Sequence, residues 1–209
     1  MPDNELALLD RWCAGDAGAG NILFTRHFPT VYRFFEHKVD GELDELVQET
    51  FFECLRSRDR FRRQSSFRTY LLAIARYTLF GYWRRRSRQI PTVQFDEISV
   101  SSLSTSVGTR MARREDQARL LHALRQLPLE QQILLELHYW EGLGAEHLVE
   151  VFDIEPATVR SRLFRARQAL RERLAESAGS EDLSDSDLDA WARKLRPEAP
   201  DGDGDGDDE

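Results

Sequence analysis

The 209-residue sequence has few of the residues that build covalent or metal-bound frameworks. Its two cysteines, Cys13 and Cys54, are too few for a disulfide framework or a zinc cluster, and both lie in helix-like patterns that predict buried thiols. The longest apolar runs, such as residues 70–75, fall far short of the roughly 20 residues that a membrane span needs. The first residues are acidic and lack the pattern of a signal peptide. We therefore expect a soluble, cytoplasmic protein without membrane insertion.

Motifs that carry catalysis are also missing from the sequence. The five histidines show no metal-ligand spacing, and there is no nucleophile motif and no glycine-rich phosphate loop. We therefore expect no enzymatic activity, no cofactor and no bound metal.

The net charge of −8 hides two segments of opposite sign. Residues 176–209 hold thirteen acidic and three basic side chains, so the rest of the chain is slightly basic. Residues 56–88 hold eleven arginines and one acidic residue, Asp59, which predicts a surface that binds a polyanion. The acidic end is expected to be largely disordered. Three roles stay open for it: inhibition by folding over the arginines, docking on a partner, and solubility.

Every strong hydrophobic period in the sequence is helical, which predicts an all-α fold of two small helical domains joined by a flexible linker. Residues 43–55 form one amphipathic pattern in the first domain. The expected linker is rich in serine, is interrupted by Pro91 and Gly108 and keeps no period. The predicted divisions are a first domain at 1–88, the linker at 89–112, a second domain at 113–176 and the acidic extension at 177–209.

Residues 146–174 have the pattern of a helix-turn-helix. A short helix leads to a turn at 153–155, and Pro156 opens a longer helix at its first position, where its missing N–H is not needed. One face of the longer helix is apolar, and the other carries small residues followed by arginines, as expected for a helix that enters the major groove. That second face consists of Ala157, Thr158, Arg160, Ser161, Arg162, Phe164 and Arg165. A helical hairpin with a solvated basic face is the alternative.

The stretch SFRTYLLAIARYTLFGYWRRRSRQ, at residues 66–89, concentrates aromatic rings and arginines on one predicted helix. Exposed rings beside arginines suit single-stranded DNA, because stacking contributes about 1–3 kcal/mol per base and the cations hold the phosphates. The alternative is that Phe80 and Trp83 pack against the rest of the first domain. Helical angles predict a core face of Phe67, Leu71, Ile74, Ala75, Thr78 and Tyr82, with Arg76, Phe80 and Trp83 pointing the other way.

The chain resembles the extracytoplasmic-function (ECF) group of bacterial sigma factors in three segments that follow the family's order. They are DELVQETFFECL (44–55), SFRTYLLAIARYTLFGYWRRRSR (66–88), and LRQLPLEQQILLELHYWEGL (124–143) followed by TVRSRLFRAR (158–167). The resemblance covers roughly residues 5–175. It implies an alternative sigma factor that binds core RNA polymerase, directs it to promoter DNA and opens the −10 element. It also allows an anti-sigma factor as a partner.

The resemblance implies roles by position. The segment that docks on the largest polymerase subunit matches Asp44, Leu46, Val47, Gln48, Glu49 and Phe51. The loop and helix that recognise and melt the −10 element match Arg60, Phe61, Arg62, Arg63, Ser65, Phe67, Tyr70, Arg76, Tyr77, Phe80, Trp83, Arg84 and Arg85. Recognition of the −35 element falls to the seven residues of the helix that Pro156 opens. For the 43–55 segment, an ordinary amphipathic core helix is the alternative, and Val47 and Phe51 are expected to serve the core in either case.

Several positions depart from the family's pattern. The family often has Asn at the position of Tyr77 and Asp at Gly81, and it commonly has Gly where this chain has Asp153 in the turn of the helix-turn-helix. Asp tolerates the left-handed conformation, so the turn is expected to survive. Two other functions stay open: a helix-turn-helix regulator that does not contact polymerase, and a sigma-like adaptor without initiation activity.

Overall fold

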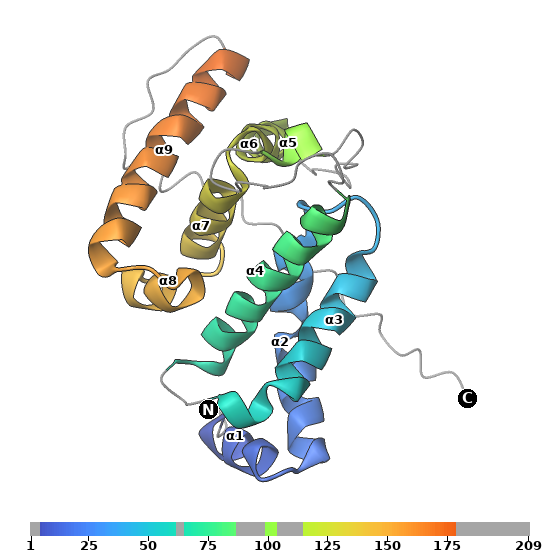
Figure 1. Cartoon of the computed structure of the whole chain (residues 1–209). Coiled ribbons are helices and arrows are strands. Elements are labelled where there is room, and N and C mark those ends of the chain that lie inside the picture. The colour runs from blue at the N-terminus through green and yellow to red at the C-terminus, as the bar shows by residue number, and fades with distance from the viewer. Residues whose placement is uncertain (1–4, 62–64, 87–98, 104–114, 179–209) are drawn as a thin grey trace.

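The computed structural model describes residues 5–61, 65–86, 99–103 and 115–178, and every regular element in these ranges is a helix (Figure 1). This confirms the all-α prediction. In the same ranges, no helix is both long and apolar enough to cross a membrane. The acidic extension is predicted to inhibit the arginine-rich surface, to dock on a partner or to aid solubility. From residue 179 onward it lies outside the described residues.

The first helical unit packs its helices around a cluster of aromatic rings. The ring of Trp12 meets that of Phe67 edge-on at 5.3 Å between centroids, and Phe24 stacks parallel to Phe67 at 6.4 Å. Gly41 and Glu42 both have positive φ, 75° and 53°, which reverses the chain between the second and third helices at the predicted Asp40–Gly41 turn. The elements of this unit are α1 (Glu5–Cys13), α2 (Ala17–Glu36), α3 (Leu43–Arg56), the short 3-10 helix η1 (Arg58–Arg60) and α4 (Phe67–Arg86).

The second helical unit ends its helices at the breaks that the sequence predicts. Pro128 immediately precedes α7, and Gly142, with a φ of 66°, follows it. Asp153 adopts the left-handed conformation (φ 53°, ψ 51°) after α8, so the turn of the helix-turn-helix survives without glycine. The elements are α6 (Glu115–Gln126), α7 (Leu129–Tyr139), α8 (Ala145–Phe152) and α9 (Pro156–Ala178).

Part of the expected linker has regular structure. Residues 99–103 contain the short helix α5 (Val100–Leu103), in which Val100 is fully buried. Ser99 pairs with Pro128 in an isolated antiparallel β-bridge. The sequence shows no period here because one buried residue and one bridge leave no repeating pattern. The other linker residues that fall at 89–98 and 104–112 lie outside the described residues.

The two helical units contact each other through α4 and α8. In Figure 1, α4 runs through the middle of the molecule, with α2 and α3 on one side and the second unit on the other. A helix placed in this way buries residues on more than one face, while Tyr77 stays exposed. This arrangement determines which of the predicted site residues are exposed.

The close contact between α1 and α2 leads to a prediction about stability. A Cβ atom added at Gly20 would lie 2.6 Å from Cδ1 of Trp12, whose side chain is buried in the core. Gly20→Ala is therefore expected to lower the free energy of unfolding by about 1–3 kcal/mol, through overpacking. Gly81→Ala is the control, because its Cβ would come no closer than 3.6 Å to Arg85 Nη1, and it should stabilise α4 by up to about 1 kcal/mol. Urea unfolding followed by circular dichroism measures both changes, and equal effects of the two substitutions would contradict the prediction.

A buried histidine at the end of α2 leads to a prediction about pH. Burial, together with the charges of Lys38 and Arg125, lowers the pKa of His37 from 6.5 to about 4. Between these two pH values the unfolded chain binds a proton that the folded chain does not, so the free energy of unfolding should fall as the pH drops through this window.

Replacing His37 with Gln should remove this component of the pH dependence, which amounts to up to about 3 kcal/mol. Urea unfolding at a series of pH values between 7 and 4 measures it. The exposed His122 of α6 provides the control, and a His122→Gln chain should keep the slope of the unaltered protein. An unchanged slope in the His37→Gln chain would refute the assignment.

Candidate nucleic-acid interface

The helix α9 presents the small and basic face that the sequence predicts. Phe164 is 63% exposed, although it is a large apolar side chain, and Arg160 and Arg165 are exposed beside it. Of the seven predicted residues, Ala157, Arg160, Ser161, Phe164 and Arg165 are exposed, while Thr158 and Arg162 are half-buried. The opposite face of α9 is buried and consists of Val159, Leu163, Ala166 and Leu170.

The chemistry of this α9 face suits a polyanion. The positive end of the α9 helix dipole lies at the surface beside these residues, because the first residues of the helix are exposed. Exposed guanidinium groups such as that of Arg160 can fork onto guanine or onto phosphate. The Nε of Arg165 donates to the carbonyl of Ser161 at 3.4 Å, which holds its guanidinium close to the helix.

The helix α4 differs from its prediction. Arg76, Phe80 and Trp83 were expected to point away from the core, but Trp83 is 1% exposed and Arg76 is 9% exposed, and Phe80 is also buried. The Nε1 of Trp83 donates to the carbonyl of Lys38 at 3.1 Å, so this ring belongs to the core of the first unit. The physical reason is that α4 packs against α2 and α3 on one side and against α8 on the other.

The side chain of Arg76 lies in an aromatic setting between the two helical units. Its guanidinium carbon lies 4.6 Å from the ring centroid of Phe80 and 4.9 Å from that of Phe152 on α8. Its Nε donates to Glu130 Oε2 at 3.3 Å, and its Nη2 donates to the other oxygen of the same carboxylate. The second unit therefore covers Arg76, and Phe80 is buried against the same guanidinium; the resemblance assigns both residues to the −10 element.

Other parts of α4 remain accessible. Tyr77 is 60% exposed, and Arg84 and Arg85 are exposed near the end of the helix. Arg85 forms an exposed ion pair with Glu49 of α3 at 3.2 Å. Such exposed pairs contribute little to stability, so Arg85 can exchange this partner for another anion.

The loop before α4 is held by its own aromatic residues. Phe61 and Phe67 are buried in the aromatic cluster, and their expected contact with a base is replaced by contact with the core. Tyr70 is half-buried, its hydroxyl donates to the carbonyl of Ser57 at 3.1 Å, and burial raises its pKa. Arg60 is exposed and Ser65 is half-buried. The predicted contacts Arg62 and Arg63 lie outside the described residues.

The predicted docking segment on α3 divides into two faces. Leu46 and Val47 are almost fully buried and serve the core, as expected of Val47 under either interpretation. Asp44 and Gln48 are exposed, while Glu49 and Phe51 are half-buried.

Sequence reasoning missed two apolar residues of α3. Phe52 is 59% exposed and Leu55 is also exposed, so they extend the exposed side of Asp44 and Gln48 to the end of the helix. The four-residue steps from Asp44 to Gln48 and from Gln48 to Phe52 could have revealed this stripe. We call Asp44, Gln48, Phe52 and Leu55 the α3 stripe.

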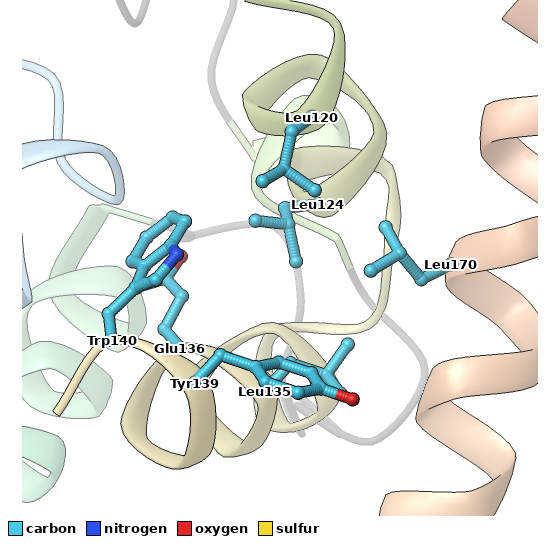
Figure 2. A pocket seen from close by; sticks show the side chains of 7 residues that line it. All are labelled: Leu120, Leu124, Leu135, Glu136, Tyr139, Trp140 and Leu170. Atoms are coloured by element: carbon cyan, nitrogen blue, oxygen red, sulfur yellow. The ribbon is translucent and has the colours of Figure 1, made fainter. Parts of the chain in front are cut away.

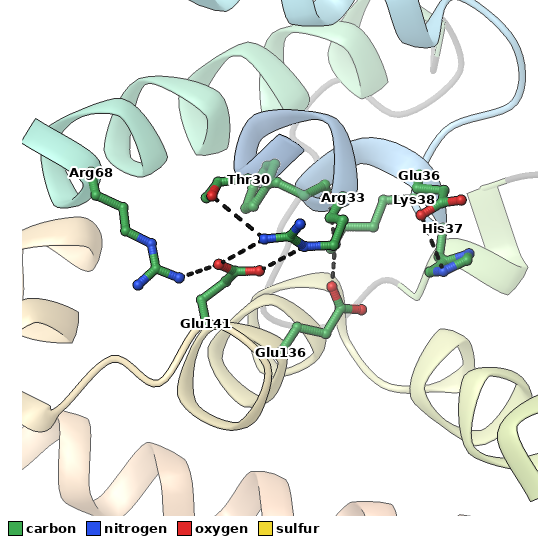
Figure 3. Close-up of polar contacts among 9 residues, drawn as sticks. Thr30, Arg33, Glu36, His37, Lys38, Arg68, Glu136 and Glu141 are labelled. Atoms are coloured by element: carbon green, nitrogen blue, oxygen red, sulfur yellow. Dashed lines mark hydrogen bonds and ion pairs between the residues drawn. The ribbon is translucent and has the colours of Figure 1, made fainter. Parts of the chain in front are cut away.

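Sequence reasoning also missed a group of ion pairs between the two units (Figure 3). Lys38, which is fully buried, pairs with Glu136 of α7, and burial raises the pKa of Glu136 against the opposing effect of Lys38. Just after α7, Glu141 accepts hydrogen bonds from Arg33 at 3.2 Å and from Arg68. These partners are more than 70 residues apart along the chain, so no local sequence pattern predicts that they pair.

The second unit also contains a small apolar hollow between α6, α7 and α9 (Figure 2). Its polar groups already have partners, because Glu136 engages Lys38 and Gln132 and the Tyr139 hydroxyl accepts from Arg167 at 2.7 Å. The hollow is therefore a packing gap and not a ligand site. Its lining consists of Leu120, Leu124, Leu135, Glu136, Tyr139, Trp140 and Leu170.

Family comparison matches both helical units. Residues 23–89 match the model of sigma-70 region 2, and residues 117–170 match that of sigma-70, region 4. The chain is 30% identical over 175 residues to the ECF RNA polymerase sigma-E factors of Salmonella typhimurium and Escherichia coli K12, covering 79% of this chain and 92% of each relative. A Haemophilus influenzae protein of the same name is 30% identical over 181 residues, covering 81% of this chain and 95% of the relative.

Two solved structures share the fold. CnrH, in complex with the cytosolic domain of CnrY, has a TM-score of 0.58 at 20% identity and covers 82% of this chain and 97% of its own. The sigma factor RpoE from Bartonella quintana, in complex with the anti-sigma factor NepR, has a TM-score of 0.59 at 22% identity and covers 74% of this chain and 95% of its own.

Proposed function

The chain belongs to the ECF family of RNA polymerase sigma factors, and on that premise we propose that it binds core RNA polymerase, directs it to specific promoters and helps to open the −10 element. Members of this family regulate transcription and are not enzymes, so we assign the chemical step of RNA synthesis to the polymerase. The unit of α1–α4 would dock on polymerase and bind the −10 element, and the unit of α6–α9 would bind the −35 element.

The observation that carries this proposal is the presence of two unlike exposed surfaces on one chain. The α9 face is basic and lies at a helix N-terminus, which suits duplex DNA. The α3 stripe combines a carboxylate and an amide with two exposed apolar side chains, which suits a protein partner. A helix-turn-helix regulator needs only the first surface, so the α3 stripe favours the sigma-factor function.

We infer a narrower set of −10 contacts than the resemblance implies. Tyr77 offers an exposed ring for stacking, and the nearby exposed Arg84 and Arg85 offer charge for phosphates. Phe61 and Phe67 support the loop from within the core and leave base contact to its polar residues, such as Arg60 and Ser65. Trp83 supports α4 by packing in the core of the first unit and makes no contact with a base.

An anti-sigma factor is a further proposed partner. The related RpoE structure contains NepR, which its description names as an anti-sigma factor. A partner of that kind would have the α3 stripe and the α9 face available on this chain, because both are exposed.

Run-off transcription with purified core polymerase tests the proposal, using promoters recovered by selecting DNA that the holoenzyme binds. Defined transcripts that depend on the added chain are the expected result. Duplex binding without initiation would favour the helix-turn-helix regulator, and polymerase binding without initiation would favour the adaptor; either result would overturn the proposal.

A substitution on α9 tests the −35 assignment. Arg160→Ala should lower run-off transcription from a selected promoter by about 5- to 150-fold, because one good base contact contributes about 1–3 kcal/mol. Arg173→Ala is the matched control, since Arg173 is an exposed arginine of the same helix that pairs with Glu176 at 3.0 Å, far from the N-terminal end. Equal losses from both substitutions would exclude Arg160 as a specific contact.

A substitution on α3 tests the docking surface. Phe52→Ala should weaken the binding of core polymerase by about tenfold, as expected for an aromatic residue at the centre of an interface, without changing the melting temperature. Leu6→Ala is the matched control, because Leu6 on α1 is 73% exposed and lies outside the α3 stripe. Titration of fluorescently labelled chain with polymerase measures both affinities, and unchanged binding of the Phe52→Ala chain would remove this residue from the docking surface.

A further inference from the structure

The basic face of α9 carries positive charge that no carboxylate neutralises within the described ranges of the chain. Arg160 and Arg165 are exposed and Arg162 is half-buried, and in those ranges none of the three pairs with an acidic side chain. An exposed arginine elsewhere shows the contrast, because Arg85 pairs with Glu49 at 3.2 Å. The α9 face therefore has cationic charge left over for an anionic partner.

The chain itself contains an anionic segment that lies beyond the described residues. Residues 179–209 hold twelve acidic and three basic side chains, and seven of the acidic ones fall in the stretch EAPDGDGDGDDE at 198–209. Asp and Gly alternate from 201 to 206, which gives an evenly spaced row of carboxylates with no bulky side chain between them. A DNA strand also presents a regular row of anions to arginines. The acidic stretch thus has the chemistry of a competitor for DNA.

The length of chain that joins the acidic stretch to α9 suits a contact on the same helix. Arg160 lies eighteen residues before Ala178, the last residue of α9, so the two are about 27 Å apart at 1.5 Å per residue. A random coil with the nineteen residues of 179–197 spans roughly 25 Å. A tether whose average length matches the span gives the highest effective concentration, in the millimolar range.

We propose that residues 198–209 bind the α9 face of the same chain and compete there with duplex DNA. The inference rests on the proposed function, since it takes the α9 face as the surface that binds the −35 element. Among the three roles that the sequence leaves open for the extension, the unneutralised arginines of α9 and the matching tether favour this one.

The competition has a predictable size and consequence. An effective concentration of about 1 mM, acting on a weak ionic contact with a Kd of about 0.1 mM, lowers the affinity for DNA about tenfold. Because the acidic stretch displaces phosphates of any duplex, the factor is the same for every DNA sequence. Weaker binding to non-specific DNA leaves more of the chain free to meet polymerase.

A spin label in the full-length chain tests the contact directly. Gly204→Cys places the label in the acidic stretch, and Cys13→Ala removes the half-buried thiol. Cys54 is buried and needs no replacement, because burial raises the pKa of its thiol to about 12. At low salt the label should broaden the backbone NMR signals of residues 157–165, and about 1 M salt should remove the broadening. Unaffected signals, or broadening confined to residues 84–86 at the end of α4, would overturn the proposal.

Neutralising the acidic stretch tests the competition. Five aspartates of the full-length chain are changed to Asn: Asp201, Asp203, Asp205, Asp207 and Asp208. This variant should bind a labelled duplex of mixed sequence about tenfold more tightly at fixed salt. Adding Arg160→Ala and Arg165→Ala should remove the gain, whereas adding Arg173→Ala should keep it, since Arg173 lies outside the α9 face. A gain that survives the loss of Arg160 and Arg165 would refute the contact.

The matched control changes the net charge equally within the same extension. Its five substitutions lie within eleven residues of Ala178, where a random coil spans only about 18 Å and falls short of Arg160. The control chain should tighten DNA binding less than about twofold, and equal tightening in both variants would reduce the effect to bare charge and overturn the proposal. The control carries Glu181→Gln, Asp182→Asn, Asp185→Asn, Asp187→Asn and Asp189→Asn.

Run-off transcription separates this inference from the proposed function. An unaltered chain that initiates, while the variant with five Asn shows no gain in DNA affinity, refutes only the competition. Broadening at residues 157–165 in a chain that initiates from no selected promoter refutes the proposed function and leaves the contact between the acidic stretch and α9 in place.

Discussion

Charge that is buried between two helical units must be paired, and this constraint governs how much of the molecule is arranged. Lys38 has no solvent exposure at the end of α2, so its position requires a carboxylate from elsewhere, which Glu136 supplies. Arg76 in the middle of α4 meets the same requirement through Glu130. Because each cation comes from the first unit and each carboxylate from the second, the pairing fixes where α7 lies relative to α4 and the end of α2.

The helix α4 shows why exposure could not be predicted from one segment of sequence. Helical angles assume one buried face, but α4 packs against α2 and α3 on one side and against α8 on the other, so it buries residues on more than one face. Trp83 therefore packs in the core of the first unit, and Phe80 is buried against the guanidinium of Arg76. The presence of Arg76 among these rings indicated that this part of α4 meets a charged partner. That partner, Glu130, lies 54 residues away and could not be identified without the fold.

Local chemistry made other features predictable. The helix boundaries follow from Pro156, Gly142 and the Asp153 turn, where one residue determines the backbone. The buried and exposed faces of α9 follow from its period, because within the described part of the chain its apolar face packs against α6, α7 and α8. On α3 the period correctly separates Leu46 from Gln48, but the exposure of Phe52 contradicts its apolar character. An apolar residue that a period places on the solvent side is thus a better indication of a partner than a charged one.

The composition of the interface between the units is itself an argument for movement. Well-packed apolar residues in place of a buried ion pair are often as stable or more stable, so ion pairs are a poor choice for a permanent contact. They suit a contact that can open, since each separated charge recovers its hydration. The apolar part of this interface includes Phe80 and Phe152, whose rings lie against the same guanidinium of Arg76.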